Sequence, residues 1–175
     1  MDNLTKSARS ALISLTKQLS VSYKGIMNRK TTTCTKRWSD IPFAHRQPKH
    51  AGHCRFIHGH NWAFEFEFIC SEKDECGFVV DFGGLKALKQ WLDDTFDHKL
   101  VLNADDPLLH QINAAQVLTG DAVLTIPDCS CEGLAEFVAQ HANRIVQAFT
   151  GHRVAVRRVT VFEDSKNSAT CEVEL

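Results

Sequence analysis

The sequence has no long apolar run, no excess of charge of either sign, and no internal repeat or low-complexity region. Its longest apolar stretches fall far short of the ~20 residues that a membrane-spanning helix needs, so we expect no membrane partner. Lysine and arginine number 20 against 21 aspartates and glutamates, which gives a formal net charge of −1. This balance offers no bulk electrostatic support for binding nucleic acid or another polyanion.

Paired Cys-x-x-Cys modules are also absent, although the chain contains seven cysteines. An odd number without paired spacing favours free thiols and a cytoplasmic location over a secreted, disulfide-stapled protein. The first twenty residues lack the unbroken apolar core of a signal peptide, because Lys6, Arg9 and Lys17 interrupt them. That segment is amphipathic, rich in serine and poor in acidic residues, which leaves a transit peptide as an alternative.

The length of 175 residues and the hydrophobic share of 43% fit a single globular domain with an appendage. A domain of this size buries about 70% of the surface of its unfolded chain. Leucines and alanines at helical spacing predict an N-terminal helix over residues 3–20, and the polar segment Gly25–Thr35 predicts a linker. We therefore expect an N-terminal helical extension and linker over residues 1–30 and a main domain over residues 31–175.

The hydrophobic pattern of the main domain predicts two strand pairs that flank two helices. Strands are expected over residues 37–46, 58–70, 153–163 and 169–175, and a shorter one over 123–126. The helices are expected to follow Asp81 and Ser130, which can cap their first turns, and Gly151 is expected to end the second. This order predicts an α+β domain with a four-stranded antiparallel sheet and both helices on one face. The two open sheet edges favour assembly by strand pairing between subunits.

Two of the predicted strands contain signs of irregularity. Val154 and Val156 have the opposite parity to the later valines of their strand, which predicts a bulge near Arg157–Arg158. Pro42 implies an edge, a bulge or a bend in the first strand. Glu163 has an inward parity at the end of its strand, and a carboxylate in that place is a candidate site residue.

Two histidines stand at the start of a strand in which aromatic residues alternate with others. His58 and His60 share the parity of those aromatic residues, so both imidazoles are expected on the apolar side. A divalent metal would explain the pair, since imidazoles two residues apart on a strand can converge on one ion. A hydrogen-bonded histidine pair at a strand end is the alternative. His45 ends the preceding strand and completes a three-histidine set of the kind that catalytic zinc uses.

Other reactive residues stand close to these histidines in the sequence. His50 and His53 are rival ligands on the intervening loop, although we expect them to be exposed to solvent. Cys54 is itself a rival metal ligand; beside a metal held by the histidines it would have a depressed pKa and act as a base or nucleophile. The other six cysteines are expected to be structural. Asp97 and His98 are either a proton-transfer pair or a surface helix terminus.

Several motifs, taken in order, resemble the family of 6-pyruvoyltetrahydropterin and 6-carboxytetrahydropterin synthases. They are His45–Arg46, Cys54–Asn61, Phe78–Phe82, Phe96–Leu100, Glu132–Ala135 and Glu163. The resemblance covers roughly residues 36–175, and the short gap between Cys54 and His58 resembles the 6-carboxytetrahydropterin branch, which feeds queuosine and other deazapurines. Two segments depart from the family pattern: Pro42 and Phe43 replace smaller residues before His45, and Cys129-Ser130-Cys131-Glu132 replaces its Pro-Thr-Ser/Ala-Glu.

The resemblance implies a zinc-dependent lyase that converts 7,8-dihydroneopterin triphosphate to 6-carboxy-5,6,7,8-tetrahydropterin, with release of acetaldehyde and triphosphate. The zinc ligands that it implies are His45, His58 and His60. The general base and proton relay that it implies are Cys54, Asp97 and His98. The substrate-binding residues that it implies are Glu163, Glu132 and Ser130. Its fold is the tunnelling fold, in which subunits pair sheet edges into a closed barrel, usually a hexamer, with active sites between subunits.

Three alternatives remain at this point. The nearest is a 6-pyruvoyltetrahydropterin synthase, which eliminates triphosphate from the same substrate. A second is a non-catalytic pterin-binding or metal-binding protein of the same fold, which the presence of Cys54, Asp97, His98 and Glu163 disfavours. A third is a redox or zinc-storage protein that uses its many cysteines.

Overall fold

The structure, a computed structural model, describes residues 30–115 and 122–174. The predicted helix over 3–20 and the first part of the predicted linker lie outside the described residues. All described helices and strands belong to one compact unit, Thr32–Leu175. The last part of the linker prediction is wrong, because the first strand already begins at Thr32. The β-branched threonines of this segment favour an extended backbone.

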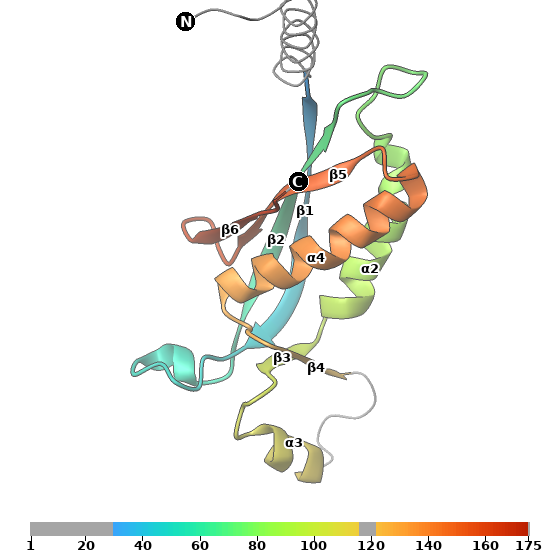
Figure 1. Cartoon of the computed structure of the whole chain (residues 1–175). Coiled ribbons are helices and arrows are strands. Elements are labelled where there is room, and N and C mark those ends of the chain that lie inside the picture. Colours follow the sequence, from blue (N-terminus) through green and yellow to red (C-terminus); the bar gives the residue numbers. More distant parts are fainter. Residues whose placement is uncertain (1–29, 116–121, 175) are drawn as a thin grey trace, which may run out of the picture. The chain divides into compact units, whose positions relative to one another are not determined.

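A six-stranded sheet runs through this unit in the order β4-β3-β1-β2-β5-β6 (Figure 1). Its strands are β1 (Thr32–His45), β2 (His58–Cys70), β3 (Leu100–Asn103), β4 (Val123–Ile126), β5 (Ala155–Phe162) and β6 (Ser168–Glu172). The neighbours β1, β2, β5 and β6 are antiparallel, as the sequence predicted, whereas β3 and β4 add two parallel strands beside β1. The prediction of a purely antiparallel four-stranded sheet is therefore wrong in this respect. All four residues of β3 are buried, so it lacks the alternation that marks a half-buried strand.

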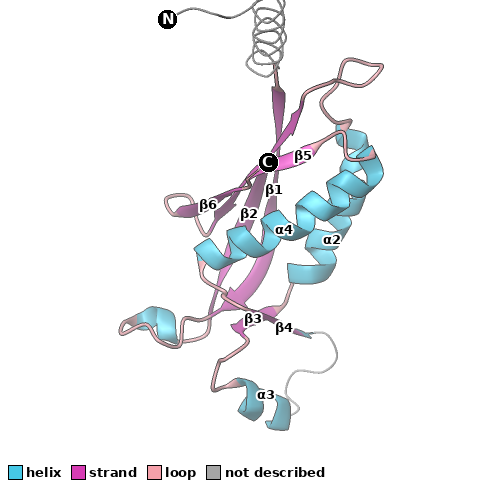
Figure 2. Ribbon diagram, in the orientation of Figure 1, coloured by secondary structure: helices cyan, strands magenta, loops and turns pink. Residues whose placement is uncertain are grey.

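Two helices cover one face of the sheet, α2 (Lys86–Phe96) and α4 (Cys131–Thr150) (Figure 2). This arrangement agrees with the sequence prediction. The connections also contain the short helix α3 (Leu109–Ala115) and the 3-10 turn η1 (His53–Arg55), neither of which the hydrophobic pattern predicts. None of the helices within residues 30–115 and 122–174 is long and apolar enough to cross a membrane.

The predicted helix caps are present. The hydroxyl of Ser130 accepts a hydrogen bond from the Gly133 N–H at 3.0 Å and so caps the first turn of α4. Gly151 ends α4 with φ at 60°, a left-handed conformation that glycine adopts without a Cβ clash. Asp81 caps the 3-10 turn η2 (Phe82–Leu85), which leads into α2.

The hydrophobic core lies between β2 and the two helices. The aromatic side chains on one face of β2 have no exposed surface; they are Trp62, Phe64, Phe66 and Phe68. Phe96 of α2 packs on this row, with its ring centroid 5.4 Å from that of Phe64. Since His58 and His60 continue the same face toward the start of β2, the aromatic row leads directly to the two histidines.

β1 and β5 each contain a β-bulge, which lets core residues before and after the bulge face the same side of the sheet. In β5 the register passes from Arg158 opposite Glu67 to Val156 opposite Phe68, which leaves one extra residue where the sequence predicted a bulge. In β1 the register shifts between Trp38 and Ile41, shortly before Pro42. Because side chains alternate along a strand, this shift allows Trp38 and the later core residues of β1 to face the same side.

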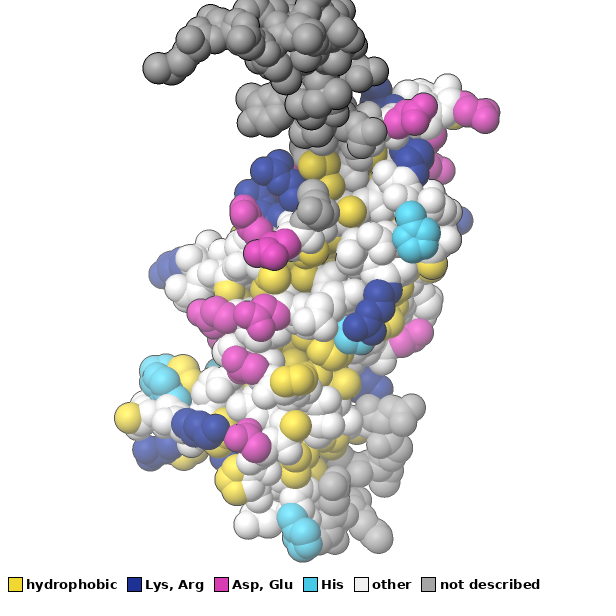
Figure 3. All heavy atoms as spheres, in the orientation of Figure 1, with side chains coloured by type: hydrophobic (Ala, Val, Ile, Leu, Met, Phe, Trp, Pro, Cys, Tyr) yellow, Lys and Arg dark blue, Asp and Glu magenta, His cyan; other side chains and the backbone are white. Residues whose placement is uncertain are grey.

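Charged side chains of both signs are interspersed over the face of the molecule shown in Figure 3, with no large area of one sign. This distribution agrees with the near-zero net charge of the sequence.

We expect Phe64→Ala to lower the free energy of unfolding by about 3–5 kcal/mol, because it opens a cavity in the aromatic core. Urea denaturation followed by circular dichroism would measure the loss. Phe149→Ala is the matched control, since Phe149 is 43% exposed and loses far less contact. Equal losses for the two variants would contradict this description of the core.

Candidate functional site

Three histidines meet at one end of the β1–β2 hairpin. His45, the last residue of β1, is paired with His58, and His60 lies two positions further along β2. The ring centroids of His45 and His58 are 4.7 Å apart, those of His58 and His60 are 5.0 Å apart, and those of His45 and His60 are 5.5 Å apart. The hairpin therefore gathers imidazoles from two strands into one cluster.

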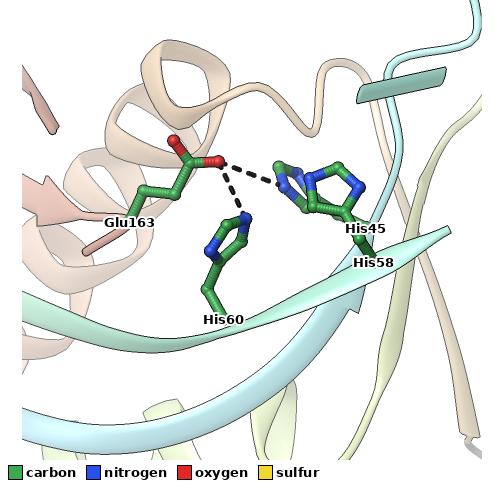
Figure 4. Close-up of side chains that lie close together, drawn as sticks. All are labelled: His45, His58, His60 and Glu163. Carbon is green, nitrogen blue, oxygen red and sulfur yellow. Dashed lines mark ion pairs between the residues drawn. The ribbon is translucent and has the colours of Figure 1, made fainter. Parts of the chain in front are cut away.

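Glu163, which directly follows β5, turns its carboxylate toward the three histidines (Figure 4). Its Oε1 lies 3.1 Å from Nε2 of His60 and 3.4 Å from Nε2 of His45. The four side chains each offer a ligand atom within 4.8 Å of the others. A group of three imidazoles and one carboxylate is thus in place, which the sequence had suggested only in part.

Backbone carbonyls orient two of the imidazoles. Nδ1 of His45 lies 2.8 Å from the carbonyl oxygen of Cys129, and Nδ1 of His58 lies 2.8 Å from that of Phe56. A carbonyl oxygen only accepts, so Nδ1 carries the hydrogen in both rings and Nε2 of the neutral ring has a free lone pair. Burial lowers the pKa of His45, which favours the neutral ring.

The cluster fits a divalent metal ion. The Nε2 atoms of His45 and His60 are buried and have no hydrogen-bond partner in the described part of the chain, although Glu163 lies near both. The Nε2 lone pair of His45 faces a carboxylate oxygen, which is unfavourable unless a cation lies between them. In a tetrahedral zinc site with bonds of about 2.0–2.1 Å, neighbouring ligand atoms lie about 3.3–3.4 Å apart. The two contacts of Glu163 are close to this spacing.

A cavity of about 480 Å³ opens beside the cluster. Its lining includes three members of the cluster, His45, His58 and Glu163, together with Cys54, Ser130 and Glu132. Six residues with candidate roles thus share one cavity although they come from β1, β2, the loop before β2, the start of α4 and the end of β5. The cavity is large enough for a bicyclic ligand with a short side chain.

A comparison with family models matches residues 33–174 to the model described as 6-pyruvoyl tetrahydropterin synthase. The chain belongs to this family. The match covers nearly all of the described residues, and the group of three histidines and Glu163 lies within it.

Curated relatives of this family member include two proteins named 6-carboxy-5,6,7,8-tetrahydropterin synthase. That of Rickettsia felis is 30% identical over 145 residues, which are 81% of this chain and 98% of the relative. That of Rickettsia bellii is 31% identical over 145 residues, with the same coverage of 81% and 98%. A shorter match, to the synthase of Rickettsia conorii, is 39% identical over 79 residues, which are 45% of this chain and 56% of that protein.

Several solved structures share the fold. A protein from Wolinella succinogenes has a TM-score of 0.69 at 19% identity, and covers 83% of this chain and 99% of its own. The Plasmodium vivax 6-pyruvoyltetrahydropterin synthase has a TM-score of 0.64 at 18% identity, with the same coverage of 83% and 99%. The expected tunnelling fold is confirmed at the level of the single chain.

Asp97 and His98 of this pterin synthase family member do not line the cavity in the single chain. Nδ1 of His98 lies 2.9 Å from Oδ1 of Asp97, so the neighbouring side chains do pair. Both remain open to solvent, with side-chain exposures of 81% for His98 and 43% for Asp97. His98 has φ at 58°, a left-handed conformation that is uncommon outside glycine, and its N–H donates to the carbonyl of Pro42 at 2.8 Å.

The cavity also contains residues to which sequence reasoning gave no role. They are Gln47, Cys131, Lys166, Asn167 and Ser168. The last three lie in the turn that directly follows Glu163, and this closeness in sequence was a usable signal. His50 is exposed, as expected, yet it lines the cavity, whereas His53 is exposed outside it.

The seven cysteines, all within the described residues, are free thiols. This agrees with the expectation from their odd number and spacing. Burial raises the pKa of both Cys129 and Cys131 to about 11, which keeps these two thiols protonated near neutral pH.

We expect His58→Ala to weaken Zn²⁺ binding by more than about 100-fold, because it removes an imidazole that binds the metal directly. Loss of a hydrogen bond that only supports such a ligand weakens binding by about 10–100-fold. Competition with a chromophoric chelator would measure the affinity. His50→Ala is the matched control, since His50 is an imidazole in the same cavity outside the four-residue group. Unchanged zinc affinity in His58→Ala would show that the cluster is not the metal site.

Proposed function

We propose that this protein is a zinc-dependent 6-carboxytetrahydropterin synthase. It would convert 7,8-dihydroneopterin triphosphate to 6-carboxy-5,6,7,8-tetrahydropterin and release acetaldehyde and triphosphate. The observation that carries the proposal is the single cavity in which the histidine–glutamate group meets Cys54. The Rickettsia relatives that carry this name, at 30–31% identity over 145 residues, support the carboxy product. We place the reaction in a cytoplasmic pathway to queuosine or another deazapurine.

Each cavity residue has a role that follows from its chemistry. Zinc held by His45, His58 and His60 would supply a Lewis acid for the side-chain oxygens of the substrate. Cys54 lies on the loop before β2 and, as a thiolate, would take the carbon-bound proton beside those oxygens.

The cavity residues beyond the three histidines suit the pterin ring. The Glu163 carboxylate can accept two parallel hydrogen bonds from the 2-amino group and N3–H of a pterin. Ser130 and Glu132 lie at the start of α4 and line the same cavity, where they would contact the substrate. A pterin bound to Glu163 would lie beside the histidine cluster, since the carboxylate is 3.1 Å from Nε2 of His60 and 3.4 Å from Nε2 of His45.

The alternative function is a 6-pyruvoyltetrahydropterin synthase, which would use the same cavity and metal. The solved structures from Plasmodium that carry that name are below 25% identical to this chain, so their likeness supports the fold and not the product. The short spacing from Cys54 to His58 favours the carboxy product.

Incubation of the purified full-length chain with 7,8-dihydroneopterin triphosphate should yield acetaldehyde and 6-carboxytetrahydropterin, identified by mass spectrometry. Removal of the metal with a chelator should stop turnover, and added Zn²⁺ should restore it. A pyruvoyl product without acetaldehyde would establish the alternative, and the absence of any product would favour a non-catalytic binding protein.

Cys54→Ala is the matched test of the base within the same experiment. It should lower kcat by at least about 100-fold while zinc binding is retained, because general-base catalysis contributes about 10²–10⁴-fold. Cys76→Ala is the control, since Cys76 is exposed and does not line the cavity. Turnover that survives in Cys54→Ala would mean that another group removes the proton.

The position of Asp97 and His98 outside the cavity calls for a second subunit. Within the described residues, β1 pairs with β3 only through Ala44, so most of one edge of β1 is open to another strand. We propose that subunits pair through such edges into a homo-oligomer, a hexamer, and that a neighbouring copy brings its Asp97 and His98 to Cys54. The relay would then be completed between subunits.

Subunit mixing would test this shared site. Cys54→Ala and His98→Ala should each be inactive alone. Co-expression should restore activity at up to about a quarter of the sites. A shared site is intact when one subunit supplies Cys54 and its neighbour supplies His98, and each of these residues is present in about half of the subunits. The double variant Cys54→Ala/His98→Ala mixed with wild type corrects for dilution. If the two single variants gain nothing on mixing, the relay between subunits is wrong.

A further inference from the structure

Two of the proposed metal ligands, His45 and His58, are oriented by hydrogen bonds to different parts of the chain. His58 is bonded to the carbonyl of Phe56, two residues away, so its orientation is set locally. His45 is bonded to the carbonyl of Cys129, which is 84 residues away in the sequence. The orientation of His45, which is only 3% exposed, therefore depends on how firmly the Cys129 segment is held against the end of β1.

The N–H, the carbonyl and the thiol of Cys129 each make a hydrogen bond. Its N–H donates to Oδ1 of Asn103 at 2.7 Å, and its thiol donates to the carbonyl of Arg46 at 3.2 Å. Its own carbonyl is the acceptor for His45. Since Arg46 directly follows His45, Cys129 contacts the end of β1 at two consecutive residues. Cys129 has no exposed surface, so these bonds do not compete with solvent.

Asn103 is anchored in turn. It ends β3, is 7% exposed, and its carbonyl accepts the N–H of Asp106 at 3.0 Å. The Asp106 carboxylate, fully shielded from solvent, accepts a hydrogen bond from Nε of Arg46 at 3.0 Å. The chain of contacts thus returns to β1. We call Arg46, Asn103, Asp106 and Cys129 the Cys129 network.

We propose that Asn103 and Cys129 are positioning residues of the metal centre, which fix the tautomer and direction of His45 through the Cys129 carbonyl. The proposal rests on the metal site of the proposed function, and adds residues that touch neither metal nor substrate. A ligand histidine whose other ring nitrogen is held by a fixed acceptor has its lone pair aimed before the metal arrives. Loss of such a supporting contact commonly weakens metal binding by about 10–100-fold.

The decisive experiment compares two asparagines that do the same structural job. Asn103→Leu removes the side-chain acceptor of the Cys129 N–H, and Asn143→Leu removes the acceptor of the Val156 N–H, bonded at 3.0 Å between α4 and β5. Affinity for Co²⁺ and Zn²⁺ is measured by chelator competition on the full-length protein without substrate, together with the visible absorption of bound Co²⁺. We expect Asn103→Leu to bind about 10–100-fold more weakly with an altered Co²⁺ spectrum. Asn143→Leu should bind like the wild type.

Conservative variants separate positioning from a general loss of packing. Asn103→Asp keeps an acceptor oxygen and should retain most of the affinity that Asn103→Leu loses. Cys129→Ser keeps a donor to the Arg46 carbonyl, whereas Cys129→Ala does not, so serine should bind metal more tightly than alanine. This second pair tests the proposal even if Asn103→Leu does not fold.

Three results would overturn the inference. Wild-type affinity and spectrum in Asn103→Leu would show that the Cys129 network does not position His45. Equal loss of metal affinity in Asn103→Leu and Asn143→Leu would show that the loss comes from general destabilisation of the fold and not from the position of His45. Equal affinities for the serine and alanine variants of Cys129 would show that the contact between Cys129 and the end of β1 does not position His45, which would also overturn the proposal. A wild-type protein that binds neither ion would instead refute the metal centre itself, and this result is distinguishable because no substrate is present.

Discussion

The antiparallel register between β1 and β2 is the constraint on which the site depends. It pairs His45 with His58 and Phe43 with His60, so that all three imidazoles project from the face that carries the aromatic core. A slip of one residue would turn His58 and His60 to the opposite face. The bulge between Trp38 and Ile41 serves the same end, because it lets the whole of β1 contribute to one core before the strand ends at His45.

The site is an extension of the hydrophobic core and not a separate surface feature. A buried imidazole is costly unless its nitrogens are bonded, and the two nitrogens of the buried His45 meet different partners. Backbone carbonyls of Cys129 and Phe56 accept the Nδ1 hydrogens, while Nε2 of His45 is turned toward Glu163. This asymmetry leaves the Nε2 lone pair of His45 facing the four-residue cluster, an arrangement that suits a metal ligand.

Local periodicity explains which parts of the fold could be predicted. The aromatic alternation of β2 and the parity change at Arg157–Arg158 each have a direct structural consequence, and both predictions are confirmed. β3 and α3 were missed as regular elements because a four-residue apolar run and a seven-residue helix are too short to show a period. No pattern within residues 100–103 predicts that β3 pairs in parallel with β1. That pairing depends on the position at which the preceding helix α2 ends.

The sequence by itself determined the residue types and the strand faces of the site. Spacing placed His58 and His60 on one apolar face, and the hairpin could only bring His45 beside them. The tertiary structure alone decided that the Cys129 carbonyl holds His45, that the turn after Glu163 lines the cavity, and that Asp97 and His98 lie outside it. The physical reason is that alternation fixes which side of a strand a residue faces, whereas contacts between distant segments are set by the packing of the whole sheet against its helices.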